Sequence, residues 1–130
     1  MTITTETLSL EEATGHVRAF LDAFGTSNAS EPTGAIGDRD ALLRYKLIRE
    51  ENEEYLDAAM NGDLVEVADA LGDILYIVCG TMLKHGLEHK MGEVFRGIQR
   101  SNMSKLDANG KAIYREDGRV LKSDMYFKPD

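Results

Sequence analysis

The chain has 130 residues, of which 42% are hydrophobic, and this is enough for one domain with its own core but too little for two. Its 23 acidic residues outnumber the 15 basic ones and give a net charge of -8, which disfavours nucleic acid as a partner because binding to a phosphate backbone needs a cationic surface. No apolar run approaches the roughly 20 residues of a membrane span, and the start of the chain lacks the pattern of a secretory signal, so we expect a cytoplasmic protein without a membrane partner.

The first two expected helices are delimited by capping signals. Ser9 followed by Glu12 is a capping box, which predicts a helix from residue 9 to about Phe24. The next stretch, NASEPTGAIGD, is rich in helix breakers and predicts a loop. Asp38 then predicts the cap of a second helix, which runs to about Asn61.

Two further helices complete the expected core. Asp63 with Glu66 repeats the capping box and predicts a third helix that ends near Gly86, and a shorter helix is expected over residues 88–101. Within the third helix the stretch ILYIVCG is apolar on all sides. A helix of this kind is buried, so we expect Cys79 to be a small core residue rather than a reactive thiol.

The remaining segment, residues 102–130, has turn signals and short apolar pairs but no helical period. It predicts a partly extended arm with a small hairpin around residues 116–118. The fold class expected is therefore all-α: a four-helix bundle core over about residues 9–101 with an irregular C-terminal arm. We expect residues 1–130 to form a single domain.

Carboxylates of the second helix occupy two kinds of position. On a helical wheel Glu51 lies inside the apolar arc and Glu54 lies at its edge. Glu53 and Asp57 point elsewhere, and we interpret them as ordinary solvated side chains. The same interpretation is the alternative for the whole acidic group, but unpaired acids rarely occupy core positions.

The third helix brings acids to the same place. Asp69 and Asp73 share one of its faces, and the short connection predicts that the second and third helices are antiparallel neighbours. Residues equally far from the turn then meet at one height, which pairs Glu54 with Asp69 and Glu51 with Asp73. Each member of the second pair is about 11 residues from Gly62, or roughly 16 Å along a helix.

Four converging carboxylates need a cation or protons to neutralise them. The ligand atoms are all oxygens, with no matching His or Cys, which predicts a hard metal ion such as Mg²⁺, with Mn²⁺ as a substitute. A di-iron bundle is disfavoured, because none of the three histidines has a Glu three residues before it.

Two acidic motifs carry a resemblance to a known superfamily. EENEE (residues 50–54) fits an E-E-x-x-E motif, and DALGDILY (residues 69–76) is similar to the second acidic motif of the MazG-like all-α nucleoside triphosphate pyrophosphohydrolases. The likeness continues through GTMLKHG, GEVFRGIQRSNMSKL and DGRVLK, so that it covers about residues 40–130. Within the superfamily, the sequence resembles most closely the branch that contains phosphoribosyl-ATP pyrophosphohydrolase and its dUTP-hydrolysing relatives.

The resemblance implies catalytic and metal-binding roles for the first motif. It makes Glu51, Glu54 and Asp73 metal ligands and catalytic residues. Glu50 belongs to the same motif, and the resemblance implies that it is either a further ligand or the acid that orients the attacking water.

One position departs from the pattern of the superfamily. The second motif is usually E-x-x-D, but Ala70 stands three residues before Asp73. Asp69 and Glu66 face the same way, so either could supply the missing metal ligand. We favour Asp69, because it matches Glu54 in height.

The resemblance also implies residues that bind the substrate. Asn102 and Lys105 in RSNMSK and Lys122 near the end are implied to contact the nucleotide or its phosphates, and Tyr126 is a further candidate. Charge favours the same segment, because Arg100 to Asp130 holds seven Lys or Arg against five Asp or Glu, in contrast to the acidic body.

The function implied is Mg²⁺-dependent hydrolysis of a nucleoside triphosphate to the monophosphate and pyrophosphate. dUTP or another deoxy or non-standard nucleotide is a candidate substrate. Two alternatives lack turnover: a nucleotide-binding regulator and a helical interaction module.

A homo-oligomer, either a dimer or a dimer of dimers, is also expected. Four modest helices leave apolar side chains hard to cover within one chain, and cyclic dimers are the commonest remedy. The residues that suggest this are Phe20, Phe24, Met82 and Leu83.

Overall fold

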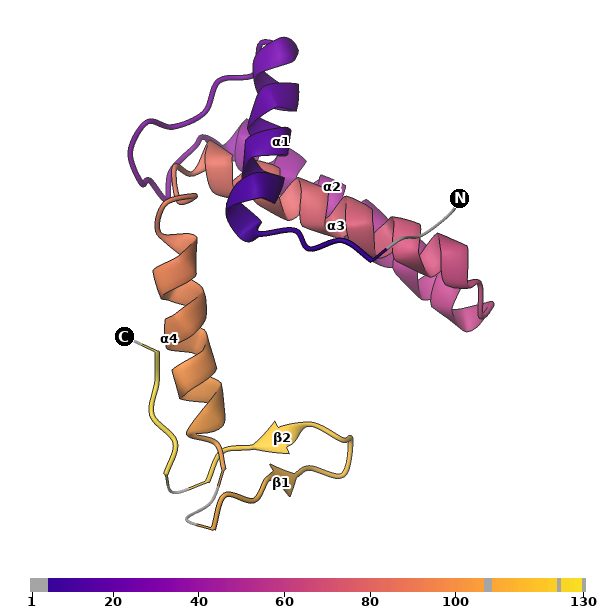
Figure 1. The fold of residues 1–130 in the computed structure, drawn as a ribbon, viewed down its shortest axis with the longest axis vertical. Helices are drawn as coiled ribbons and strands as arrows, with labels where there is room; N and C mark the ends of the chain where they lie inside the picture. Colours follow the sequence, from indigo (N-terminus) through magenta and orange to yellow (C-terminus); the bar gives the residue numbers. More distant parts are fainter. Residues whose placement is uncertain (1–4, 107–108, 124, 130) are drawn as a thin grey trace. The chain divides into compact units, whose positions relative to one another are not determined.

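The computed structural model describes residues 5–106, 109–123 and 125–129, and over these the predicted all-α class is confirmed. Four helices are followed by a short two-stranded hairpin in the C-terminal arm (Figure 1). The chain divides into two compact units, Met1–Glu88 and His89–Asp130. The helices of the first unit are α1 (Leu10–Ala23), α2 (Asp38–Met60) and α3 (Leu64–Lys84).

Two of the predicted caps form as expected. Ser9 Oγ accepts a hydrogen bond from the backbone N–H of Glu12 at 3.1 Å, and Asp63 Oδ1 accepts one from the N–H of Glu66 at 3.2 Å. Each carboxylate or hydroxyl satisfies a donor that the first turn of a helix would otherwise leave without a partner.

The predicted cap of the second helix is wrong by one residue. Asp38 is the first residue of α2, and Gly37 takes the cap position without a side-chain hydrogen bond. Gly37 has φ of 89°, a conformation that side chains rarely adopt, so the backbone there favours glycine over the aspartate.

The fourth helix, α4 (Met91–Met103), begins three residues later than predicted. After α3 the backbone N–H of Leu87 donates to the carbonyl of Met82 at 2.9 Å, and Gly86 takes a φ of 67°. This bond and the turn at Gly86 close the end of α3, and residues 88–90 then form a further turn instead of the first turn of α4.

The core of the first unit lies between α1 and α3. Val17 and Leu21 of α1 pack on Cys79 and Leu83 of α3, and Cys79 is only 3% exposed, as predicted for a core residue. The expectation that the whole apolar stretch is buried is wrong for Leu75, which is 64% exposed, because α1 and α2 cover only two sides of α3.

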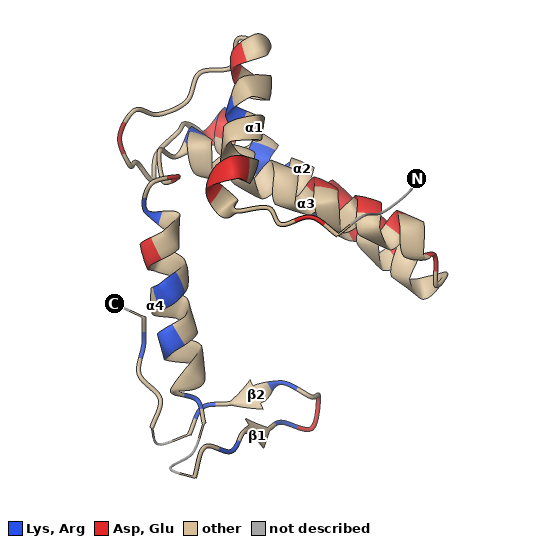
Figure 2. Ribbon diagram, viewed as in Figure 1, with Lys and Arg blue, Asp and Glu red and all other residues tan. Residues whose placement is uncertain are grey.

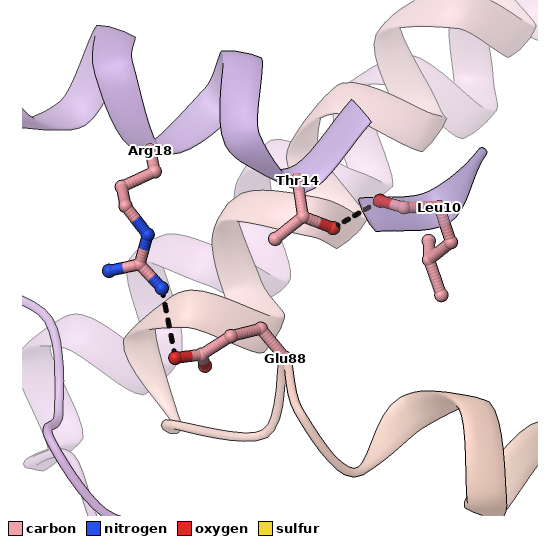
Figure 3. A network of polar contacts seen from close by, with 4 residues as sticks. All are labelled: Leu10, Thr14, Arg18 and Glu88. Atoms are coloured by element: carbon pink, nitrogen blue, oxygen red, sulfur yellow. Dashed lines mark hydrogen bonds and ion pairs between the residues drawn. The ribbon is translucent and has the colours of Figure 1, made fainter. Parts of the chain in front are cut away.

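Polar contacts also hold α1 in place. Arg18 Nη2 lies 3.0 Å from Glu88 Oε1, which links α1 to the chain just beyond α3 (Figure 3). The hydroxyl of buried Thr14 donates to the carbonyl of Leu10 at 2.7 Å, so that its burial leaves no donor unsatisfied.

In the second unit the arm carries the predicted hairpin. Strand β1 (Ile113–Tyr114) pairs antiparallel with β2 (Val120–Leu121), and the turn between them includes residues 116–118. The end of the arm is bound to α4, because Ser101 Oγ donates to the carbonyl of Phe127 at 2.8 Å. None of the helices in the described part of the chain is long and apolar enough to cross a membrane.

Candidate metal and catalytic site

Three carboxylates from two helices come together in the first unit. Glu51 and Glu54 of α2 and Asp73 of α3 each offer an oxygen, and these oxygens lie within 4.8 Å of one another. Figure 2 shows acidic residues along both helices of this pair. We refer to Glu51, Glu54 and Asp73 as the carboxylate cluster.

The turn between α2 and α3 explains why these residues meet. Gly62 has φ of 64° and closes a connection of only a few residues, so that the two helices pack side by side in opposite directions (Figure 1). Glu51 and Asp73 are equally far from Gly62 along the chain and therefore stand at the same height. Glu54 follows Glu51 by three residues and lies on the same side of α2.

The electrostatics of Glu51 show that the carboxylate cluster is crowded with negative charge. Its Oε2 is buried without a hydrogen-bond partner. Burial, a hydrogen bond shared with Glu54 and the charge of Asp73 raise the pKa of Glu51 from 4.5 to about 7, and Asp69 adds a smaller contribution. Without a cation, the cluster therefore holds a proton up to about neutral pH.

These observations fit a divalent metal ion. A buried oxygen without a partner and three mutually repelling carboxylates are both relieved when a cation binds between them. All three side chains offer oxygens, which are the ligands that Mg²⁺ and Mn²⁺ prefer. Glu51, Glu54 and Asp73 would hold such an ion.

The two candidates for the missing ligand lie beside the cluster rather than in it. Asp69 and Glu66 are exposed and line a cleft of about 410 Å³, together with Glu54. Asp69 is near enough to affect the pKa of Glu51 through its charge. Ala70 itself is buried at 3% exposure and faces the same cleft.

Other acids of α2 are placed differently. Glu50 is exposed and is not one of the three clustered residues. Glu53 is exposed and pairs with Arg49 at 3.1 Å, in agreement with its interpretation as a solvated side chain. Asp57 is also exposed, but it lines the cleft with Glu54, a role that its spacing of three residues from Glu54 could have indicated.

The residues expected to bind substrate all belong to the second unit. Asn102 is exposed in the last turn of α4, and Lys105 follows as a half-buried residue whose N–H donates to the carbonyl of Asn102. Lys122 is exposed, and its Nζ lies 4.6 Å from the ring centre of half-buried Tyr126. Lys122 and Tyr126 are thus in contact with each other.

The pKa of Glu51 predicts how the metal-free protein responds to pH. Folded Glu51 binds its proton up to about pH 7, whereas an ordinary carboxyl loses it near 4.5. Between these values the folded state holds more protons than the unfolded state, so the contribution of Glu51 to the free energy of unfolding falls as the pH rises. Urea unfolding in EDTA at pH 5 and pH 8 should show a smaller fall for Glu51→Gln than for the wild type. If the free energy of unfolding fell equally in the two proteins, a raised pKa of Glu51 would be contradicted.

Comparisons with known proteins point to one family. Residues 17–102, about two thirds of the chain, match the family model described as phosphoribosyl-ATP pyrophosphohydrolase. The matched segment contains all three residues of the carboxylate cluster. The chain is also 39% identical over 77 residues to an uncharacterized protein of Acanthamoeba polyphaga mimivirus. That alignment covers 59% of this chain and 26% of the viral protein, so it spans about a quarter of that relative.

Proposed function

The chain belongs to the phosphoribosyl-ATP pyrophosphohydrolase family, and on this premise we propose that it is a nucleotide pyrophosphohydrolase. It hydrolyses a nucleoside triphosphate between the α and β phosphates, with Mg²⁺ as the cofactor and Mn²⁺ as a substitute. The observation that carries the proposal is the carboxylate cluster, in which three acidic side chains from two helices lie within 4.8 Å and one buried oxygen has no partner.

The roles of the residues follow from their places. Glu51, Glu54 and Asp73 would hold the cation, and Asp69, which lines the adjacent cleft, adds negative charge beside them. When bound there, Mg²⁺ would neutralise charge on the phosphates and lower the pKa of the attacking water. Glu50 is exposed next to Glu51 in the same motif, and we propose that it is either a further ligand or the acid that orients that water as a hydrogen-bond acceptor.

We propose that cations of the second unit bind the phosphates of the triphosphate. The first unit is strongly acidic, whereas residues 100–130 hold seven Lys or Arg against five Asp or Glu, and this charge difference supports donors for the remaining phosphate oxygens in the segment after α4. Lys105 and Lys122 are the proposed phosphate-binding residues. Asn102 can donate to and accept from a sugar, base or phosphate, and Tyr126, beneath Lys122, completes the proposed set.

The substrate is proposed to be a nucleoside triphosphate such as dUTP or another deoxy or non-standard nucleotide. A screen of ribo, deoxy and modified triphosphates should yield monophosphate and pyrophosphate with at least one of them, and EDTA should abolish the release. Products of diphosphate and orthophosphate, or a rate unchanged by EDTA, would contradict the proposal.

A nucleotide-binding regulator is the second candidate, and Ala70 favours it. The position that carries an acid in related motifs is here a buried alanine, so one carboxylate is missing from its usual place. A rise in the melting temperature with nucleotide and Mg²⁺, without any pyrophosphate release, would identify the regulator.

We also propose that the protein is a homo-oligomer, most simply a dimer. Phe24 and Leu75 are 73% and 64% exposed. Phe20 is 45% exposed, and its ring lies against that of Phe24 with 4.6 Å between the ring centres. Apolar surface of this kind is commonly covered by a second copy. Met82 and Leu83 do not contribute to this argument, contrary to expectation, because both are buried within the chain.

Sedimentation tests the oligomer directly. We expect a species larger than the monomer at micromolar concentration, and replacing Phe24 and Leu75 by Ser should shift it toward the monomer. A stable monomer for the wild-type protein would contradict the proposal.

A further inference from the structure

One cation lies between α2 and α3 and has no part in the proposed chemistry. Arg44 of α2 donates from Nε to Thr81 Oγ1 and from Nη2 to the carbonyl of Ile77, each at 3.0 Å. The hydroxyl of Thr81 also donates to the carbonyl of Ile77, at 2.8 Å. A single side chain of α2 is therefore bonded to two successive turns of α3.

The space that Arg44 occupies is shaped for it. Gly80 of α3 lies opposite, and a Cβ at that position would come within 2.8 Å of Arg44 Nη2. Arg44 and Gly80 are also equally far from Gly62 along the chain, as Glu51 and Asp73 are. Arg44 therefore stands opposite Gly80 as Glu51 stands opposite Asp73, but two helical turns further from Gly62.

Arg44 lies on the same side of α2 as Glu51 and Glu54 of the carboxylate cluster. It precedes Glu51 by seven residues, which is two helical turns and about 10 Å along the axis. On α3 the carbonyl that it binds belongs to Ile77, one turn beyond Asp73. Burial lowers the pKa of Arg44 and the charge of Asp40 partly offsets this, and the guanidinium stays charged because its ordinary pKa lies far above neutral.

We propose that Arg44 is a positioning residue: its two hydrogen bonds to α3 fix how far α2 is shifted along α3, and this holds Glu51 opposite Asp73. The inference rests on the proposed function in so far as the cluster binds a divalent cation. Apolar contacts between two helices tolerate sliding, whereas hydrogen bonds to Thr81 and Ile77 are satisfied at one register only. A shift of one turn would move the carboxylates about 5 Å apart.

The first test measures the affinity for Mn²⁺ by EPR titration of the full chain. Arg44→Met keeps the apolar stem and removes the donors, and it should weaken Mn²⁺ binding by about tenfold or more, the range found when groups that orient metal ligands are lost. Lys46→Met is the matched control, because Lys46 is an exposed cation of α2. Removing a positive charge should by itself tighten the binding of a divalent cation, so charge and positioning predict opposite signs.

A second variant leaves Arg44 in place. Gly80→Ala puts a methyl group against the guanidinium, whose flexible end can move aside, so the helices should still pair while the hydrogen bonds are disturbed. It should weaken Mn²⁺ binding in the same direction as Arg44→Met. Affinities of Arg44→Met and Gly80→Ala equal to that of Lys46→Met, or tighter than the wild type, would overturn the inference.

A third measurement reads the register without metal. Spin labels at Arg39→Cys and Leu71→Cys, both exposed, stand about 20 Å apart along the helix axes, while Cys79 is buried. We expect Arg44→Met to shift or broaden the distance distribution by EPR, and an unchanged distribution would overturn the inference. If the wild-type protein bound no Mn²⁺, the proposed function would fail, and this distance would still decide the role of Arg44.

Discussion

Replacing Glu51 by Gln should lower the rate of nucleotide hydrolysis by at least about 100-fold, and Asp73→Asn should do the same. Removing one pre-organised electrostatic group, such as a donor of an oxyanion hole, costs about 10²–10³ in rate, or about 2.7–4 kcal/mol. Both amides are close in shape to the acids that they replace, so the helices should pack as before. Steady-state assays of pyrophosphate release with saturating Mg²⁺ measure the effect.

The control for this pair comes from the same helix. Glu53→Gln makes the identical chemical change two residues from Glu51, at an exposed side chain that pairs with Arg49 at the surface. Its rate should stay within about twofold of the wild type, since surface ion pairs contribute little.

Stability separates catalysis from folding in these variants. In the absence of metal Glu51→Gln should be as stable as the wild type at neutral pH or more stable, because it removes a carboxylate whose buried oxygen has no partner. A rate close to that of the wild type for both Glu51→Gln and Asp73→Asn would remove the carboxylate cluster from the mechanism.

Truncating the chain after Ser101 should abolish nearly all hydrolysis while the first unit stays folded. The truncation removes Lys105 and Lys122, the proposed partners of the phosphates, and leaves the contacts among α1, α2 and α3 untouched. Circular dichroism should retain most of the helical signal, while pyrophosphate release falls to the background.

Single substitutions test which residues of the arm are responsible for the effect of the truncation. Lys105→Ala should raise KM, lower kcat or do both, because it removes one proposed phosphate donor. Lys128→Ala is the matched control, since Lys128 is an exposed residue near the end of the arm. Full activity in the truncated protein would show that the arm is not part of the site.

The sequence was sufficient for the parts of this protein that depend on neighbouring residues. Helix caps are local, because a side chain at Ser9 or Asp63 bonds a backbone N–H three residues away, and both were predicted correctly. The hairpin in the arm is local for the same reason. The cap at Asp38 was predicted wrongly because the backbone angle of Gly37, which no side chain announces, decided where α2 begins.

The carboxylate cluster was accessible to the sequence because it depends on one short turn. Two helices joined by a short turn at Gly62 run side by side in opposite directions. Because each residue adds a fixed rise along a helix, the residue numbers alone predict that Glu51 and Asp73 lie at the same height, and the structure has them together. The proposed roles of these residues stay predictions until the rates of their variants are measured.

The exposure of Leu75 and the charges around Glu51 were decided by the tertiary structure. Leu75 is exposed although its segment is apolar on every side, because α1 and α2 pack on other sides of α3 and leave Leu75 uncovered. The pKa of Glu51 depends on groups from both helices and on the burial of one oxygen, which no single segment encodes. In the sequence, Arg44 is indistinguishable from an ordinary exposed cation of a helix. Its hydrogen bonds to Thr81 and Ile77 join residues more than 30 positions apart at 3.0 Å, and Gly80 leaves the space for the guanidinium. Only the packing of α2 on α3 brings these residues together.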